Sequence, residues 1–200
     1  MSKLIPASLG AAGVGGAGYG GYLLLNPSEN KEVVVTTIRE KYKTSLLSFE
    51  GTTDEKAWES KFSSLKSGTP NHPDLKAIDT AKEEKAKHKE TCKKIYDSPA
   101  DNKNYFEDFK KYCSKLIGDV VGGTWVTDDG KVDNKLKEVK TNKDSLLHKE
   151  LKNLFSKLTT DTFDDPIRKE LKDWCSFKKD QLFLGEESNI IDEIKKYCTE

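Results

Sequence analysis

A duplicated motif that contains cysteine places the strongest constraint on what this chain can fold into. The segment Glu107–Cys113 (EDFKKYC) recurs near the C-terminus as Asp192–Cys198 (DEIKKYC). Each copy is preceded, at a similar spacing, by a second cysteine, which is Cys92 in one case and Cys175 in the other. Two related halves, each with two cysteines, are the simplest explanation of this arrangement.

Apolar residues in both halves recur at the spacing of amphipathic helices. The clearest stripe consists of Tyr105, Phe106, Phe109, Tyr112, Cys113, Leu116 and Ile117. Because each stripe is narrow, the helices should pack on one another. Pro73 and Pro166 suit first-turn positions, and Ser188 suits a helix cap. The sequence predicts an all-α fold, a helical bundle of two related two-cysteine modules at residues 29–122 and 123–200.

The region between the two modules is expected to break the helical pattern. Residues 123–133 hold two short runs of strand-forming residues on either side of Asp129 and Gly130, which favour a turn. The sequence therefore predicts a small hairpin or turn at the module boundary, and it interprets Asp128–Gly130 as a turn rather than as a calcium loop.

The repeat is expected to extend upstream of the cysteines. Phe62–Leu65 resembles Phe155–Leu158, and a proline follows each segment. Since the first half is longer here by about ten residues, nearly three helical turns, Pro73–Asp97 is predicted to be a longer copy of Pro166–Phe183.

The paired cysteines suggest one disulfide in each half, Cys92 with Cys113 and Cys175 with Cys198. Closing a loop of roughly twenty residues stabilises a fold by about 3 kcal/mol, and it requires an oxidising compartment. Reduced cysteines on apolar helix faces are the alternative, since free cysteine is a common core residue. A zinc site is disfavoured, because the spacing is not C-x-x-C and the only nearby imidazole is His88, one turn before Cys92.

The N-terminal residues 1–28 differ from the rest of the chain in composition. No charged residue occurs from Leu4 to Ser28, and Ile5–Leu25 would span about 31 Å as a helix, close to the thickness of a hydrocarbon core. Seven glycines dilute the apolar residues. A cleaved signal peptide is the alternative, but the most apolar run, Tyr22–Leu25, follows the glycines. We therefore expect residues 1–28 to form a retained, single-span membrane anchor.

Small residues recur every fourth position in this segment, at Ser8, Ala12, Gly16 and Gly20. Such a ladder lets two membrane helices approach closely, so these residues are candidates for a homodimer contact through the anchor. The alternative is that small residues are merely tolerated there.

The side of the membrane on which the body lies is open to two interpretations. Lys31, Arg39, Lys41 and Lys43 follow the anchor, and by the positive-inside rule they favour a cytoplasmic body. The cysteine pairs favour an extracellular body, which is the expectation adopted.

Charge and catalytic residues exclude several classes of function. The chain has 34 basic and 34 acidic residues, and only Arg39 and Arg168 are arginine, so nucleic-acid binding is not expected. None of the histidines, His72, His88 and His148, lies in a catalytic or metal-binding signature, and each is interpreted as a surface or cap residue. The sequence therefore predicts no cofactor, no metal and no enzymatic activity, and an unrecognised enzyme is the weakest alternative.

The opening Met1–Leu4, the segment Leu9–Gly16, the lysine-rich body and the spaced cysteines resemble the paralogous families of uncharacterised proteins of haemotropic mycoplasmas. The resemblance implies a membrane-associated, surface-displayed product of a wall-less bacterium that lives on red cells, and it transfers no functional residue. The partner expected for such a product is a host cell-surface protein or a second copy of the chain. A membrane-anchored interaction protein or antigen is the first expectation. A membrane-tethered scaffold facing the cytoplasm is the second.

Overall fold

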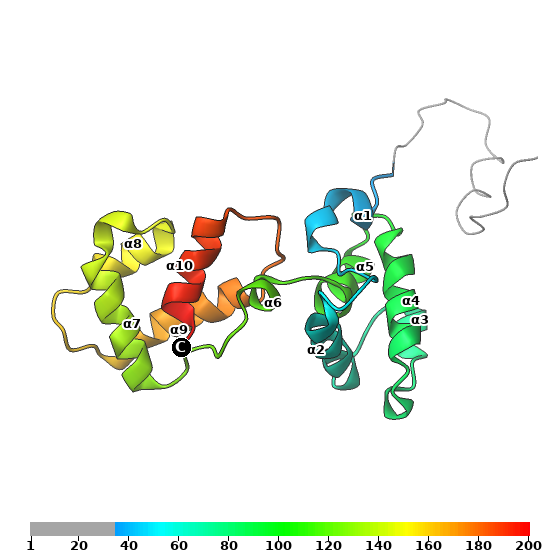
Figure 1. Ribbon diagram of the computed structural model, residues 1–200, viewed down its shortest axis with the longest axis horizontal. Helices are drawn as coiled ribbons and strands as arrows, with labels where there is room; N and C mark the ends of the chain where they lie inside the picture. The colour runs from blue at the N-terminus through cyan, green and yellow to red at the C-terminus, as the bar shows by residue number, and fades with distance from the viewer. Residues whose placement is uncertain (1–34) are drawn as a thin grey trace, which may run out of the picture. The chain divides into compact units, whose positions relative to one another are not determined.

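The computed structural model describes residues 35–200, which form one compact unit. This part of the chain contains ten α-helices, and the all-α prediction is confirmed (Figure 1). The predicted anchor at residues 1–28, with Ser8, Ala12, Gly16 and Gly20, lies outside the described residues. Within residues 35–200, every helix is too short or too polar to cross a membrane.

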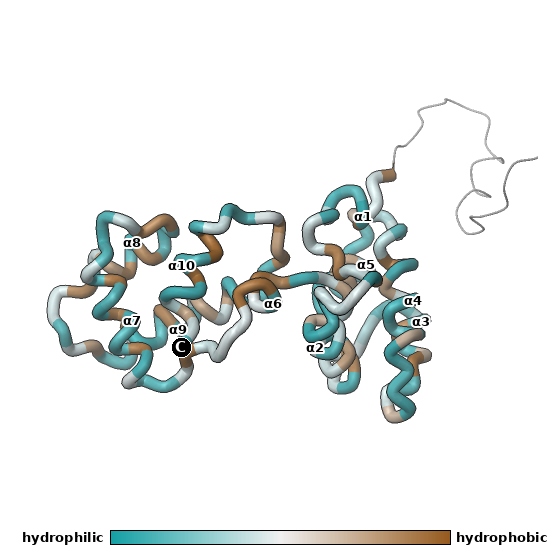
Figure 2. The backbone as a smooth tube through the Cα atoms, in the orientation of Figure 1, coloured by the Kyte–Doolittle hydropathy of each residue, from teal (hydrophilic) through white to brown (hydrophobic). Residues whose placement is uncertain are grey.

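The helices fall into two successive groups of five. The first group is α1 (Ile38–Lys41), α2 (Glu55–Lys66), α3 (Pro73–Lys76), α4 (Lys85–Tyr96) and α5 (Lys103–Asp108), which a π-helical turn at Phe109–Cys113 extends. The second group is α6 (Ile117–Val121), α7 (Asp129–Thr141), α8 (Lys149–Phe155), α9 (Asp165–Lys179) and α10 (Ser188–Cys198). Apolar and hydrophilic residues interleave along the helices in both groups, as amphipathic packing requires (Figure 2).

Backbone pairing shows that the two groups are copies of one another. In the first group, an isolated bridge joins Thr37, just before α1, to Pro99, just after α4. In the second group, the equivalent bridge joins Leu116, just before α6, to Leu182, just after α9. A second equivalent pair of bridges joins Leu46 to Ser114 and Trp125 to Thr199. The duplication therefore extends well upstream of the cysteine motifs, and it pairs α1 to α5 in order with α6 to α10.

Two hydrophobic cores correspond to the two halves. Ile38 and Leu47 belong to the first core, whereas Ile117 and Val121 belong to the second. Apart from Leu182, which packs in the first core, the cores divide the chain at Leu116, earlier than the expected division between 122 and 123. Short helix α6 opens the second half because Ile117 is the counterpart of Ile38.

The predicted hairpin at residues 123–133 is wrong. Residues 129–133 are the first turns of α7, and the Asp128 side chain accepts a hydrogen bond from the Lys131 amide at 3.1 Å. Asp128 is thus an N-cap rather than part of a turn. Trp125 pairs with Thr199 instead of with a neighbouring strand, since that contact closes the second half.

Three further expectations about the helices are wrong. Phe62 lies in α2, which corresponds to α7, whereas Phe155 ends α8, so the proposed match between them does not hold. The extra residues of the first half do not lengthen one helix, because a left-handed residue, Glu83, separates α4 from the 3₁₀ turn before it. Pro73 and Pro166 occupy first-turn positions as predicted, but Ser188 is the first residue of α10 and Glu187 is its cap.

Candidate interaction surface

The disulfides join equivalent elements in the two halves. Cys92 of α4 is bonded to Cys113 with their Cα atoms 5.3 Å apart, and Cys175 of α9 is bonded to Cys198 at the end of α10 with a Cα separation of 5.4 Å. All four residues are buried. The predicted pairing is confirmed, and the alternative of reduced core thiols is not what the structure has.

Each half also contains a buried carboxylate that caps a short helix. In the first half, Asp108 accepts hydrogen bonds from the amides of Asn71 at 2.8 Å and His72 at 2.5 Å, just before α3. In the second half, Glu193 accepts hydrogen bonds from the amides of Leu147 at 2.6 Å and His148 at 2.9 Å, just before α8. Sequence reasoning missed this device, although both acids stand at the second position of the duplicated motif.

The histidines at these caps have structural roles. The Nδ1 atom of His72 accepts a hydrogen bond from the Asp74 amide at 3.2 Å, which agrees with its predicted cap role. In the other half, Nδ1 of His148 lies 2.5 Å from the Glu193 carboxylate. Both carboxylates therefore hold a turn through backbone hydrogen bonds.

The third histidine, His88, was expected on the surface but is buried, with 1% of its area exposed. Its Nε2 atom lies 2.9 Å from the Tyr112 carbonyl oxygen, and the Trp58 ring packs edge-on with a centroid separation of 5.7 Å. Burial lowers the pKa of His88 to about 4. In the sequence, lysines flank His88 on α4, and this pattern indicated an exposed position rather than a buried one.

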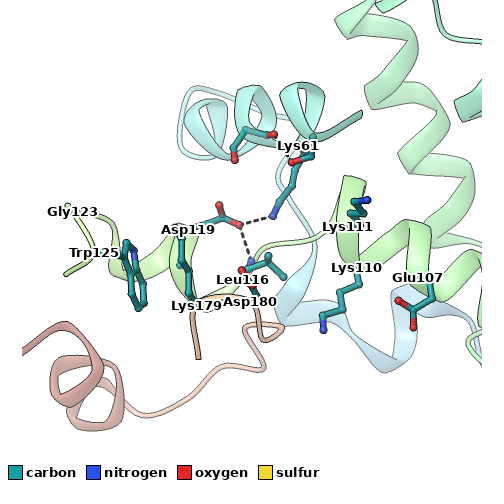
Figure 3. Close-up of a pocket in the computed structure, with 13 residues that line it drawn as sticks. Lys61, Glu107, Lys110, Lys111, Leu116, Asp119, Gly123, Trp125, Lys179 and Asp180 are labelled. Atoms are coloured by element: carbon teal, nitrogen blue, oxygen red, sulfur yellow. Dashed lines mark hydrogen bonds and ion pairs between the residues drawn. The ribbon is translucent and has the colours of Figure 1, made fainter. Parts of the chain in front are cut away.

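A polar cleft of about 600 Å³ lies between α2, α6 and the end of α9 (Figure 3). Within it, Lys61 forms an ion pair of 3.0 Å with Asp119, which also accepts a hydrogen bond from the Leu116 amide at 2.8 Å. Burial lowers the pKa of Lys61, while the Asp119 carboxylate opposes this shift. The pair joins the first half to the second, so its first role is to hold the halves together.

A second concavity, of about 450 Å³, is the more apolar of the two. We call it the apolar groove. It is lined by Tyr42, Phe106, Lys110, Ile117, His148, Phe177, Lys178, Gln181, Leu182, Leu184, Glu186, Ile190 and Ile194. Two of these side chains are strongly exposed, Phe177 at 59% and Leu184 at 58% of their areas. Exposed large apolar residues that gather at a concave surface are typical of protein-binding sites.

The arrangement of the groove follows from a difference between the halves. By the cysteine alignment of α4 with α9, Phe177 takes the position of Lys94, which pairs with Asp74 at 2.8 Å. The equivalent backbone bonds of Ala100 and Phe183 place Leu184 where the first half has Asp101. The second half thus exposes apolar side chains at positions that its copy fills with charged ones.

The histidine rings of residues 35–200 all have structural partners. The hydrogen-bond partners of the three histidine rings in this part of the chain are a backbone amide, a backbone carbonyl and a carboxylate, and none is a serine or cysteine nucleophile. Trp58 and Trp174 lie in the cores, whereas Trp125 lines the polar cleft. Comparisons with protein-family models, with curated proteins and with solved structures found no match for this chain.

Proposed function

We propose that this protein is a membrane-anchored interaction protein displayed outside the cell, and that the apolar groove binds an apolar segment of a host cell-surface protein. The observation that carries the proposal is the exposure of Phe177 and Leu184 beside the groove. Burying such side chains against a partner contributes roughly 25 cal/mol per Å² of apolar area. Residues that are charged in one half and apolar in its copy support a role in binding rather than in folding.

The two disulfides support the outside location. Structural disulfides form and persist in oxidising compartments, and here one closes each half of the described region. The uncharged residues 4–28 supply the proposed tether, and the ladder at Ser8, Ala12, Gly16 and Gly20 supplies a proposed homodimer contact.

A cytoplasmic scaffold remains the second candidate, because basic residues follow the proposed anchor. Protease treatment of intact cells separates the two. If the body is external, protease digests it on intact cells, and non-reducing gels of untreated cells show the protein with both disulfides formed. A body that is protected from protease until the cells are lysed would contradict external display.

Binding by the groove is tested with the full-length protein in host-cell adhesion or pull-down assays. We expect the double variant Phe177→Ser, Leu184→Ser to lose at least tenfold in binding. The matched control is Val120→Ser, since Val120 is an exposed apolar residue that does not line the groove. Equal binding by the double variant and the control would reject the groove as the binding surface.

A further inference from the structure

The first disulfide has a metal-ligating neighbour that the second one lacks. His88 lies on α4 one turn before Cys92, so both side chains project from the same face of the helix. A ring nitrogen of His88 and the sulfur atoms of Cys92 and Cys113 all lie within 4.8 Å of one another. In the second half, the residue one turn before Cys175 is Leu171, which is buried in the core.

The possible donor atoms lie close enough together to converge on one metal ion once the disulfide is reduced. The Tyr112 carbonyl oxygen lies 2.9 Å from Nε2 of His88 and 3.6 Å from Sγ of Cys92. Donor atoms that share a tetrahedral Zn²⁺ at its usual bond lengths of about 2.0 to 2.3 Å are separated by about 3.3 to 3.8 Å. The separation of Cys92 Sγ and the Tyr112 carbonyl oxygen falls in this range. The two sulfurs are closer because they are bonded to each other, and Nε2 of His88 is closer to the carbonyl oxygen because the two share a hydrogen bond, which a bound metal would replace.

The imidazole lies between apolar rings and a small cavity of about 90 Å³. Glu55 and Glu59 line this cavity together with Lys85 and Lys89, so its charges balance. The rings of Trp58 and Phe62, both 5.7 Å from the imidazole, surround His88 with apolar groups. In such surroundings a divalent cation with two thiolates and a neutral imidazole forms a site without net charge.

We propose that reduction of the Cys92–Cys113 disulfide opens a Zn²⁺ site formed by His88, Cys92, Cys113 and the Tyr112 carbonyl oxygen, and that the second half has no such site. The S–S bond breaks as it takes up two electrons, and each sulfur takes up one proton. Two thiols supply both electrons and both protons and end as a disulfide. A phosphine supplies the two electrons, and water supplies the two protons and the oxygen of the resulting phosphine oxide. Zn²⁺ then displaces the two thiol protons to solvent and binds both thiolates and the imidazole. This inference is independent of partner binding by the apolar groove.

The test uses full-length protein in detergent, reduced with a phosphine and titrated with Zn²⁺ against a coloured chelator. We expect one tightly bound zinc in each reduced chain and none in the oxidised chain. His88→Leu, which copies the second half, should bind at least about 100-fold more weakly, since even outer-shell changes lower affinity by about 10- to 100-fold. Zinc affinity that is the same in the reduced wild type and in the variant would overturn the proposal.

Alkylation of the unmodified sequence provides a measurement that does not depend on how well the variant folds. Zn²⁺ should slow the alkylation of Cys92 and Cys113 in the reduced protein, as read by mass spectrometry, without slowing that of Cys175 and Cys198. Equal protection of both pairs, or protection of neither, would contradict the site.

Discussion

The two halves of the described region use one scaffold for different purposes. Both join their second cysteine to the helix before it, and both use a buried acid, Asp108 or Glu193, to hold the turn before a short helix. They differ at positions that this scaffold leaves open. The first half buries His88 where the second has Leu171, and the second exposes Phe177 where the first has Lys94.

This comparison separates residues that build the fold from residues that are free to acquire a function. Groups shared by the halves make backbone contacts or disulfides, so changing them should affect both halves alike. Groups that differ should affect only one half.

Removing either disulfide should destabilise the protein by about 3 kcal/mol. The bonds close loops with sequence separations of 21 and 23 residues. Two double variants, Cys92→Ala with Cys113→Ala and Cys175→Ala with Cys198→Ala, should therefore lower the free energy of unfolding by similar amounts. Urea unfolding followed by circular dichroism measures both. A loss of under 1 kcal/mol in one half would show that the two bonds are not equivalent.

His88 should make the first half, and not the second, less stable as the pH falls. The pKa of His88 is lowered by burial to about 4, so the unfolded chain, with a pKa of about 6.5, binds the proton more readily. The free energy of unfolding should therefore fall by roughly 2 to 3 kcal/mol between pH 6.5 and pH 4, with little further loss from this group below pH 4.

The matched control is His88→Leu in the oxidised protein without metal. Burial also lowers the pKa of His72, but His72 is present in both proteins, so the difference between their pH profiles isolates His88. Parallel profiles would mean that His88 does not carry this dependence.

Replacing the buried acids should have a smaller effect, of about 2 kcal/mol in each half. Asp108→Ala leaves two backbone amides without their acceptor, and Glu193→Ala does the same while also removing the partner of His148. Glu193→Ala should therefore lower the melting temperature at least as much as Asp108→Ala. Asp192→Ala, which changes the exposed acid directly before Glu193, serves as the control and should alter the melting temperature little.

The smallest effect on stability is expected at the rim of the apolar groove. Phe177→Ser should change the free energy of unfolding by less than about 0.5 kcal/mol, because its side chain is largely exposed. The same holds for Lys94→Ser in the first half, where an exposed ion pair is lost. A large destabilisation by Phe177→Ser alone would assign this side chain to folding rather than to binding.

Local sequence pattern and tertiary structure determine different features of this protein. Helical periodicity and the duplicated cysteine motif were sufficient to predict an all-α body and the correct disulfide partners, because they depend on residues close in sequence and on two near-identical segments. The sequence did not reveal that α2 and α7 are equivalent, because they share only the spacing of buried residues such as Phe62 and Leu136.

Only the tertiary structure decided the environment of individual side chains. His88 follows Lys87 and precedes Lys89, which suggests a surface position, but Trp58, Phe62 and the Tyr112 carbonyl converge on it from other elements. The apolar groove likewise combines Tyr42 and Phe106 with Phe177 and Leu184 from distant segments. Secondary structure follows from local pattern, whereas burial, pKa and the shape of a binding surface depend on residues brought together by folding.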